Sequence, residues 1–118
     1  CNFIKIDVEL MEIDVLKGGE RLIKKFKPVL WLENHQNYPN NINEYLLQKD
    51  YTPYWCATRL FNPDNFNLDN HNVFNNMSTL NTLAIHKSYK IDIDCVSMGI
   101  TKVTNKYTPV EVARTRVL

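Results

Sequence analysis

The spacing of apolar and polar residues changes several times along the first third of the chain. Residues 3–8 are mostly apolar and β-prone, which predicts a buried strand. From residue 11 to residue 26 apolar residues recur at helical spacing, with acids early and lysines late, as the helix dipole favours. Pro28 ends this helix, and the apolar run at residues 29–32 predicts a second strand.

The remaining pattern predicts a helix, two strands and a tail. Residues 41–49 have one apolar side and predict a short helix, whereas residues 51–60 and 80–86 are β-prone and predict an antiparallel hairpin around a long asparagine-rich loop. Residues 91–94 alternate like an exposed strand, and residues 101–118 show no convincing period. A helix between two strands implies a right-handed parallel crossover. The chain is therefore predicted to be α/β, in the order β-α-β-α-β-β with the last strand antiparallel, over residues 1–87, followed by a tail at 88–118.

Two adjacent glycines, Gly18 and Gly19, interrupt the first predicted helix. Each costs about 1 kcal/mol relative to alanine inside a helix. Either the helix breaks there or close packing against the sheet requires the missing side chain, and we favour close packing. The residues expected on the buried face of this helix are Val15, Leu16, Leu22, Ile23 and Phe26.

Composition narrows the class of protein. A length of 118 residues suits one small domain, and a net charge of +1 gives no signature of nucleic-acid binding. Lys24, Lys25 and Lys27 gather at a helix end, where cations favour the dipole, with a phosphate-binding patch as the alternative. Three cysteines far apart suggest neither a disulfide framework nor a zinc site, so a cytoplasmic location is expected. No apolar run is long enough to predict a membrane span.

Polar side chains follow both predicted parallel strands. Asp7 and Glu9 end the first strand region, and Glu33 and His35 end the second. Open α/β sheets place their chemistry at this carboxyl-end rim, and alternation would put Asp7 and Glu9 on one side if the strand continues. A carboxylate there could accept the proton of a substrate hydroxyl, and His35 could act as a base. The alternative is that the acids only cap the next helix.

Four segments also resemble a known family: I-K-I-D-V-E at 4–9, M-E at 11–12, V-L-K-G at 15–18 and K-P-V-L-W-L-E at 27–33. Over about residues 2–87 the chain resembles the FkbM family of S-adenosylmethionine-dependent methyltransferases. The resemblance implies the C-terminal half of a Rossmann-like class I methyltransferase sheet, with S-adenosylmethionine as cofactor and no metal. It implies catalytic roles for Asp7, Glu9 and Glu33, with Asp7 also touching the cofactor, and His35 joins them as a catalytic candidate because it follows the second strand. The implied acceptor is a hydroxyl of a sugar or glycan, or of a small natural product.

Two departures from the family pattern matter. Leu10 stands where the family motif has glycine, so it either adopts an ordinary conformation at small cost or narrows the pocket beside the acids. The family's glycine-rich cofactor loop has no counterpart, because the only glycines are Gly18, Gly19 and Gly99. The chain alone is therefore expected to be inactive. The alternatives from other classes are a metal-dependent hydrolase or phosphotransfer module, in which Asp7 and Glu33 could hold Mg²⁺, and a non-catalytic interaction domain.

Overall fold

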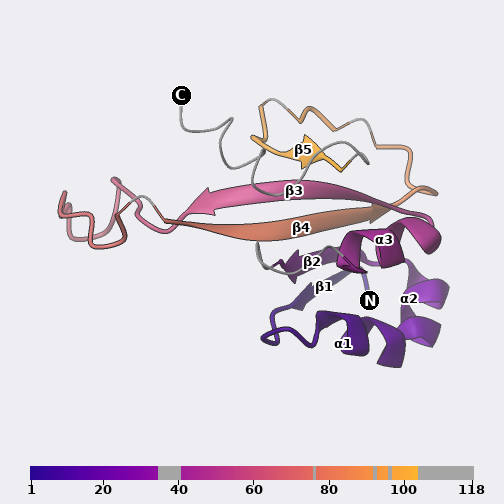
Figure 1. Cartoon of the computed structure of the whole chain (residues 1–118). Coiled ribbons are helices and arrows are strands. Elements are labelled where there is room, and N and C mark those ends of the chain that lie inside the picture. Colours follow the sequence, from indigo (N-terminus) through magenta and orange to yellow (C-terminus); the bar gives the residue numbers. More distant parts are fainter. Residues whose placement is uncertain (35–40, 76, 92, 96, 104–118) are drawn as a thin grey trace.

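A computed structural model describes residues 1–34, 41–75, 77–91, 93–95 and 97–103. The chain forms a mixed α/β structure in which helices lie against one face of a five-stranded sheet (Figure 1). Among these residues, no helix has the length and apolar character needed to cross a membrane. The elements in chain order are β1 (Phe3–Ile6), α1 (Glu12–Gly18), α2 (Glu20–Phe26), β2 (Val29–Glu33), α3 (Asn41–Gln48), β3 (Tyr51–Arg59), β4 (Ser78–His86) and β5 (Thr101–Lys102).

The strands lie in the order β1-β2-β4-β3-β5. β1 and β2 are parallel, and β4 runs antiparallel to both of its neighbours, β2 and β3. The predicted parallel crossover and the predicted closing hairpin are therefore both confirmed. The predicted exposed strand at residues 91–94 is wrong for those of its residues that are described, and β5, which pairs with β3, was not predicted.

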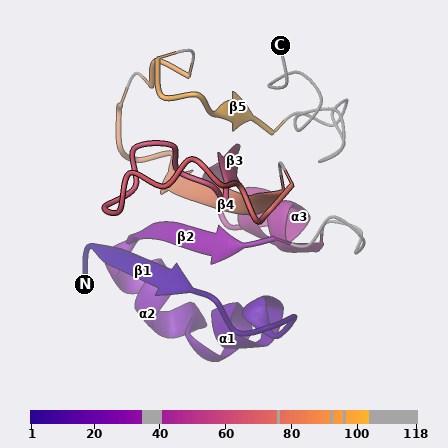
Figure 2. The same ribbon diagram turned by 90° about the vertical axis from the view of Figure 1, so that its left-hand side faces the viewer.

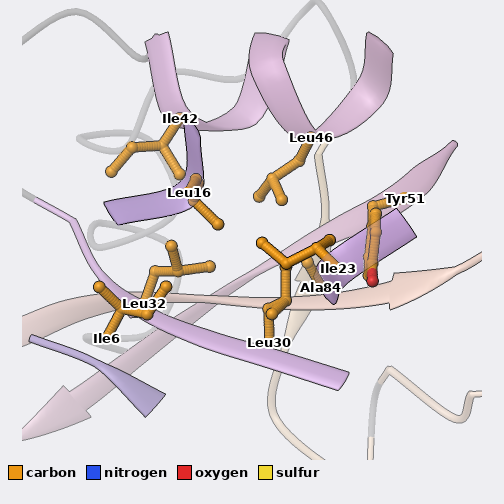
Figure 3. Close-up of a cluster of buried hydrophobic side chains, with 9 residues drawn as sticks. All are labelled: Ile6, Leu16, Ile23, Leu30, Leu32, Ile42, Leu46, Tyr51 and Ala84. Carbon is orange, nitrogen blue, oxygen red and sulfur yellow. The ribbon is translucent and has the colours of Figure 1, made fainter. Parts of the chain in front are cut away.

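The main hydrophobic core lies between the sheet and the three helices (Figure 3). Alternate residues of β2 and β4 point toward the helices, as the two-residue period of a strand requires. Trp55 of β3 is fully buried near Leu80, as expected of a packing residue. The core residues are Ile6, Leu16, Ile23, Leu30, Leu32, Ile42, Leu46, Tyr51 and Ala84.

The helical segment between β1 and β2, which consists of α1 and α2, differs from the expected helix in two ways. The helix breaks at Gly19. A Cβ atom added at Gly18 would meet no atom within 4 Å, and the atoms nearest to one added at Gly19 belong to the flanking helices, with the carbonyl oxygen of Val15 at 3.3 Å, so the prediction of close packing against the sheet is wrong. The buried face is also narrower than predicted. Leu16 and Ile23 are buried, whereas the side chains expected beside them are exposed, namely Val15, Leu22 and Phe26.

The second face of the sheet is covered in part by the segment that follows β4. Ile93, Cys95 and Ile100 pack against Tyr54 and Cys56 of β3. This segment then returns to the sheet edge as β5. Ile93, Cys95 and Ile100, together with the strand β5, therefore make part of the predicted tail a contributor to the folded structure.

The hydroxyl of Tyr51 couples stability to pH. It donates a hydrogen bond of 3.0 Å to the carbonyl oxygen of Pro28, and burial, with a smaller effect of Tyr89, raises the pKa of Tyr51 from 10.0 to about 12. Because the unfolded chain loses this proton first, stability is expected to hold below about pH 10 and to fall as pH rises toward 12. Urea unfolding across this range should show a weaker fall in Tyr51→Phe. An equally steep fall in the variant would contradict this coupling.

Candidate active site

A tight turn carries the first two acids. β1 ends at Ile6, two residues earlier than predicted, and Glu9 and Leu10 then adopt left-handed backbone conformations with φ of 48° and 75°. The backbone N–H of Met11 donates to the carbonyl oxygen of Val8 at 3.3 Å, which closes the turn before α1 begins. Because the strand has already ended, the turn and not strand alternation sets where the carboxylates of Asp7 and Glu9 lie.

Asp7, Glu9 and Glu33 converge at the carboxyl ends of β1 and β2. One carboxylate oxygen from each residue lies within 4.8 Å of the others. The parallel register, with Ile6 opposite Leu32, brings the residues that follow each strand to the same rim, as predicted (Figure 2 views this end of the sheet). We call these three residues the acid cluster. Its carboxylates are open to solvent, since Asp7 and Glu9 are exposed and Glu33 is half-buried, so a substrate can reach them.

Lys5 belongs to the same site, although the sequence reasoning did not single it out. Its ammonium group donates to a carboxylate oxygen of Asp7 at 2.9 Å. Both side chains are exposed, so the pair adds little to stability, but it orients Asp7 and offsets part of the cluster's negative charge. The available signal was a lysine two residues before an acid at the end of a predicted strand, although the turn after Ile6 sets the final position of Asp7.

Glu12 holds the turn from the helix side. The residue is buried, with 2% of its surface exposed, and its carboxylate accepts a hydrogen bond of 3.2 Å from the backbone N–H of Val8. This contact satisfies a donor within the turn that carries Asp7 and Glu9. Glu12 is therefore a positioning residue for the acid cluster and does not itself belong to it.

Leu10 is expected to store strain in this turn. A φ of 75° is a conformation that glycine adopts freely and a leucine side chain resists, so the suggestion that Leu10 adopts an ordinary conformation is wrong. Leu10→Gly should stabilise the fold by about 1 kcal/mol, even though glycine also loosens the unfolded chain. Chemical denaturation measures the change. Val8→Gly is the matched control, because Val8 is exposed and has no positive φ, and it should destabilise the fold. If both variants destabilise the fold, Leu10 does not store strain in the turn.

A buried polar network lies directly behind Glu33. The side-chain amide of Asn34 donates to the hydroxyl of Thr82 at 3.0 Å, and that hydroxyl donates to the side-chain oxygen of Asn43 at 3.2 Å. All three residues are buried. The network joins the end of β2 to β4 and α3, and it fixes the segment from which Glu33 projects.

Three of the four predicted catalytic residues form the acid cluster, and the fourth is His35. His35 lies outside the residues that the structure describes, so its catalytic role stays a prediction. The loop between β3 and β4 extends away from the sheet beyond the ends of the hairpin (Figure 1). Several of its polar side chains bond to nearby backbone, for example Asn65 to Asp69 and Asn72 to Phe74.

In a comparison with known proteins, a family model matches the part of the chain that carries the acid cluster. Residues 1–53 match the methyltransferase FkbM domain family. The FkbM resemblance seen in the sequence is thereby confirmed for the segment from β1 to the start of β3. A methyltransferase is the class of enzyme that this match supports. No curated protein and no solved structure matches the chain significantly.

Proposed function

We propose that the chain supplies the carboxyl-terminal part of a Rossmann-like, S-adenosylmethionine-dependent methyltransferase, and that the acid cluster serves O-methylation of a sugar or small natural product. The observation that carries this proposal is the convergence of Asp7, Glu9 and Glu33 within 4.8 Å, inside the segment that matches the FkbM family. A cytoplasmic location is part of the proposal and rests on the widely spaced cysteines.

The acid cluster can provide the acceptor side of the reaction. When bound, S-adenosylmethionine would supply the methyl group, with cleavage of its S–CH3 bond and release of S-adenosylhomocysteine. A carboxylate of the acid cluster would accept the proton of the acceptor hydroxyl. Lys5 and Glu12 keep the carboxylates in place through the contacts to Asp7 and Val8. The surplus of negative charge disfavours acceptors that carry a phosphate or carboxylate near the reacting hydroxyl.

The described residues include no glycine-rich cofactor loop. Gly18 and Gly19 lie in and between helices, and Gly99 lies in the segment before β5, so none follows a strand as a cofactor loop requires. We therefore place the principal cofactor-binding residues outside these 118 residues. Carboxylates at this spacing could also bind a metal, but the family match favours the methyltransferase over the alternative hydrolase.

Titration calorimetry of the 118-residue chain with S-adenosylmethionine tests this division of roles. We expect no measurable heat of binding, because the glycine-rich cradle is missing. Circular dichroism of the same sample confirms that the chain is folded during the titration. Tight binding by the folded chain would contradict the mapping onto the carboxyl-terminal part of the family fold.

A further inference from the structure

A pocket of about 360 Å³ lies at the end of the sheet opposite the acid cluster. It is located where β3 begins and β4 ends, since Tyr51 and His86 are paired there, and beside the carboxyl end of α2. Its volume is within the range of small-molecule sites. Its lining includes Ile23, Lys24, Lys27, Tyr45, Lys49 and His86, together with the two acids Glu20 and Asp50.

The charged groups around this pocket leave a positive balance. Lys49 pairs with Glu20 across the pocket, and Lys87, outside it, pairs with Asp50 at 3.4 Å. Lys24 and Lys27 form no ion pair with any residue that the structure describes. Both acids of the lining are therefore already paired, while two ammonium groups remain available to a ligand.

The pKa of His86 responds to this positive charge. Burial first, and then the nearby Lys27, lower the pKa of His86. Its Nδ1 lies 2.9 Å from the hydroxyl of Ser88, and its ring meets that of Tyr51 edge to face at 5.1 Å. The imidazole is thus fixed at the wall of the pocket, where its signals will respond to a bound anion.

The remaining wall is apolar and aromatic. Ile23 is a buried residue of the lining, and the ammonium group of Lys49 lies 5.3 Å from the centroid of the Tyr45 ring, a cation–π distance. We propose that this pocket binds a small organic anion, in which a phosphate or carboxylate contacts Lys24 and Lys27 and an apolar or aromatic body lies against Ile23 and Tyr45. This site is separate from the acid cluster and does not depend on the proposed methyltransferase activity.

The simpler interpretation is that the lysines only balance the carboxyl end of α2. Lys25 fits that interpretation, since its ammonium group lies 5.0 Å from the ring of Phe26 and does not line the pocket. Lys24 and Lys27 differ, because they share one concavity with groups from α3, β3 and β4. Convergence of three further elements on the lysines is what distinguishes a binding site from a capped helix end.

Binding of phenyl phosphate to the 118-residue chain, followed by NMR of the His86 ring and by calorimetry, tests the proposal. We expect saturable shifts of the His86 signals, and at least tenfold weaker binding in the double variant Lys24→Gln, Lys27→Asn. Asparagine suits position 27 because it tolerates the left-handed φ of 49° found there. Lys17→Gln, an exposed lysine of α1 outside the pocket, is the matched control and should bind as the unmodified chain does.

Benzoate, inorganic phosphate and phenol identify the chemistry that is recognised. The proposal is supported if phenyl phosphate or benzoate binds saturably and more tightly than inorganic phosphate and phenol do. Comparison of phenyl phosphate with benzoate then shows whether the pocket prefers a phosphate or a carboxylate. Equal binding of phenol, unchanged binding in a folded double variant, or no shift at His86 with either organic anion would overturn the proposal. Near-ultraviolet circular dichroism verifies that each variant is folded.

Discussion

Asp7→Asn is expected to lower methyl transfer by about 100-fold or more in the longer methyltransferase to which we propose this chain belongs. The amide keeps the size of the carboxylate but cannot accept the acceptor proton. Because Asp7 is exposed, the fold should be little affected. Single-turnover transfer of a radiolabelled methyl group measures the change in the chemical step, and separate calorimetry with S-adenosylmethionine shows whether cofactor affinity has changed.

Asp14→Asn is the matched control for this substitution. Asp14 is an exposed acid in the first turn of α1, close in sequence to the acid cluster but outside it. The control should retain nearly full turnover. Equal losses of turnover in the two variants would mean that the effect comes from the negative charge at the start of α1. Full turnover in Asp7→Asn would mean that Asp7 has no role in the reaction.

Thr82→Val is expected to destabilise the fold by about 2–4 kcal/mol. The hydroxyl of Thr82 accepts from Asn34 and donates to Asn43, and the two shapes are nearly the same, so the variant removes both hydrogen bonds without opening a cavity. Each buried amide left without a partner costs about 1–3 kcal/mol. Among the described residues the Nδ2 of Asn43 has no hydrogen-bond partner, so the hydroxyl of Thr82 is the contact on which this side chain depends. Urea unfolding at neutral pH measures the loss.

Thr52→Val is the control for the threonine-to-valine exchange itself. Thr52 lies in β3, pairs with Ile85 of β4 and is half-buried, and its side chain forms no hydrogen bond with any described residue. Valine is β-prone, so this variant should be neutral or slightly stabilising. A loss in Thr82→Val no greater than that in Thr52→Val would mean that the network contributes little.

The parts of the fold that could be predicted are those set by local patterns. The short apolar runs of β1 and β2, with Pro28 between helix and strand, are sufficient to predict a parallel crossover. That crossover places Asp7 and Glu33 at one rim, and the structure confirms the placement. Glu9 was placed correctly for a reason that does not hold, because β1 ends before it and a left-handed turn directs its carboxylate.

The features that could not be predicted depend on residues far apart in the sequence or on backbone detail. β5 has two residues, too few to show a period, and it exists because β3 offers an edge. Asn34 and Thr82 are 48 residues apart, so no local pattern indicates their hydrogen bond. The burial of Glu12 depends on the turn at Leu10, and a leucine there gives no sequence signal for positive φ.

A structure of the methyltransferase that contains this chain, bound to S-adenosylhomocysteine and a hydroxyl acceptor, tests the role of the acid cluster most directly. We expect the acceptor oxygen to lie about 2.6–3.2 Å from a carboxylate oxygen of Asp7, Glu9 or Glu33. An acceptor bound at another edge of the sheet, with all three carboxylates facing only solvent, would contradict the proposed function.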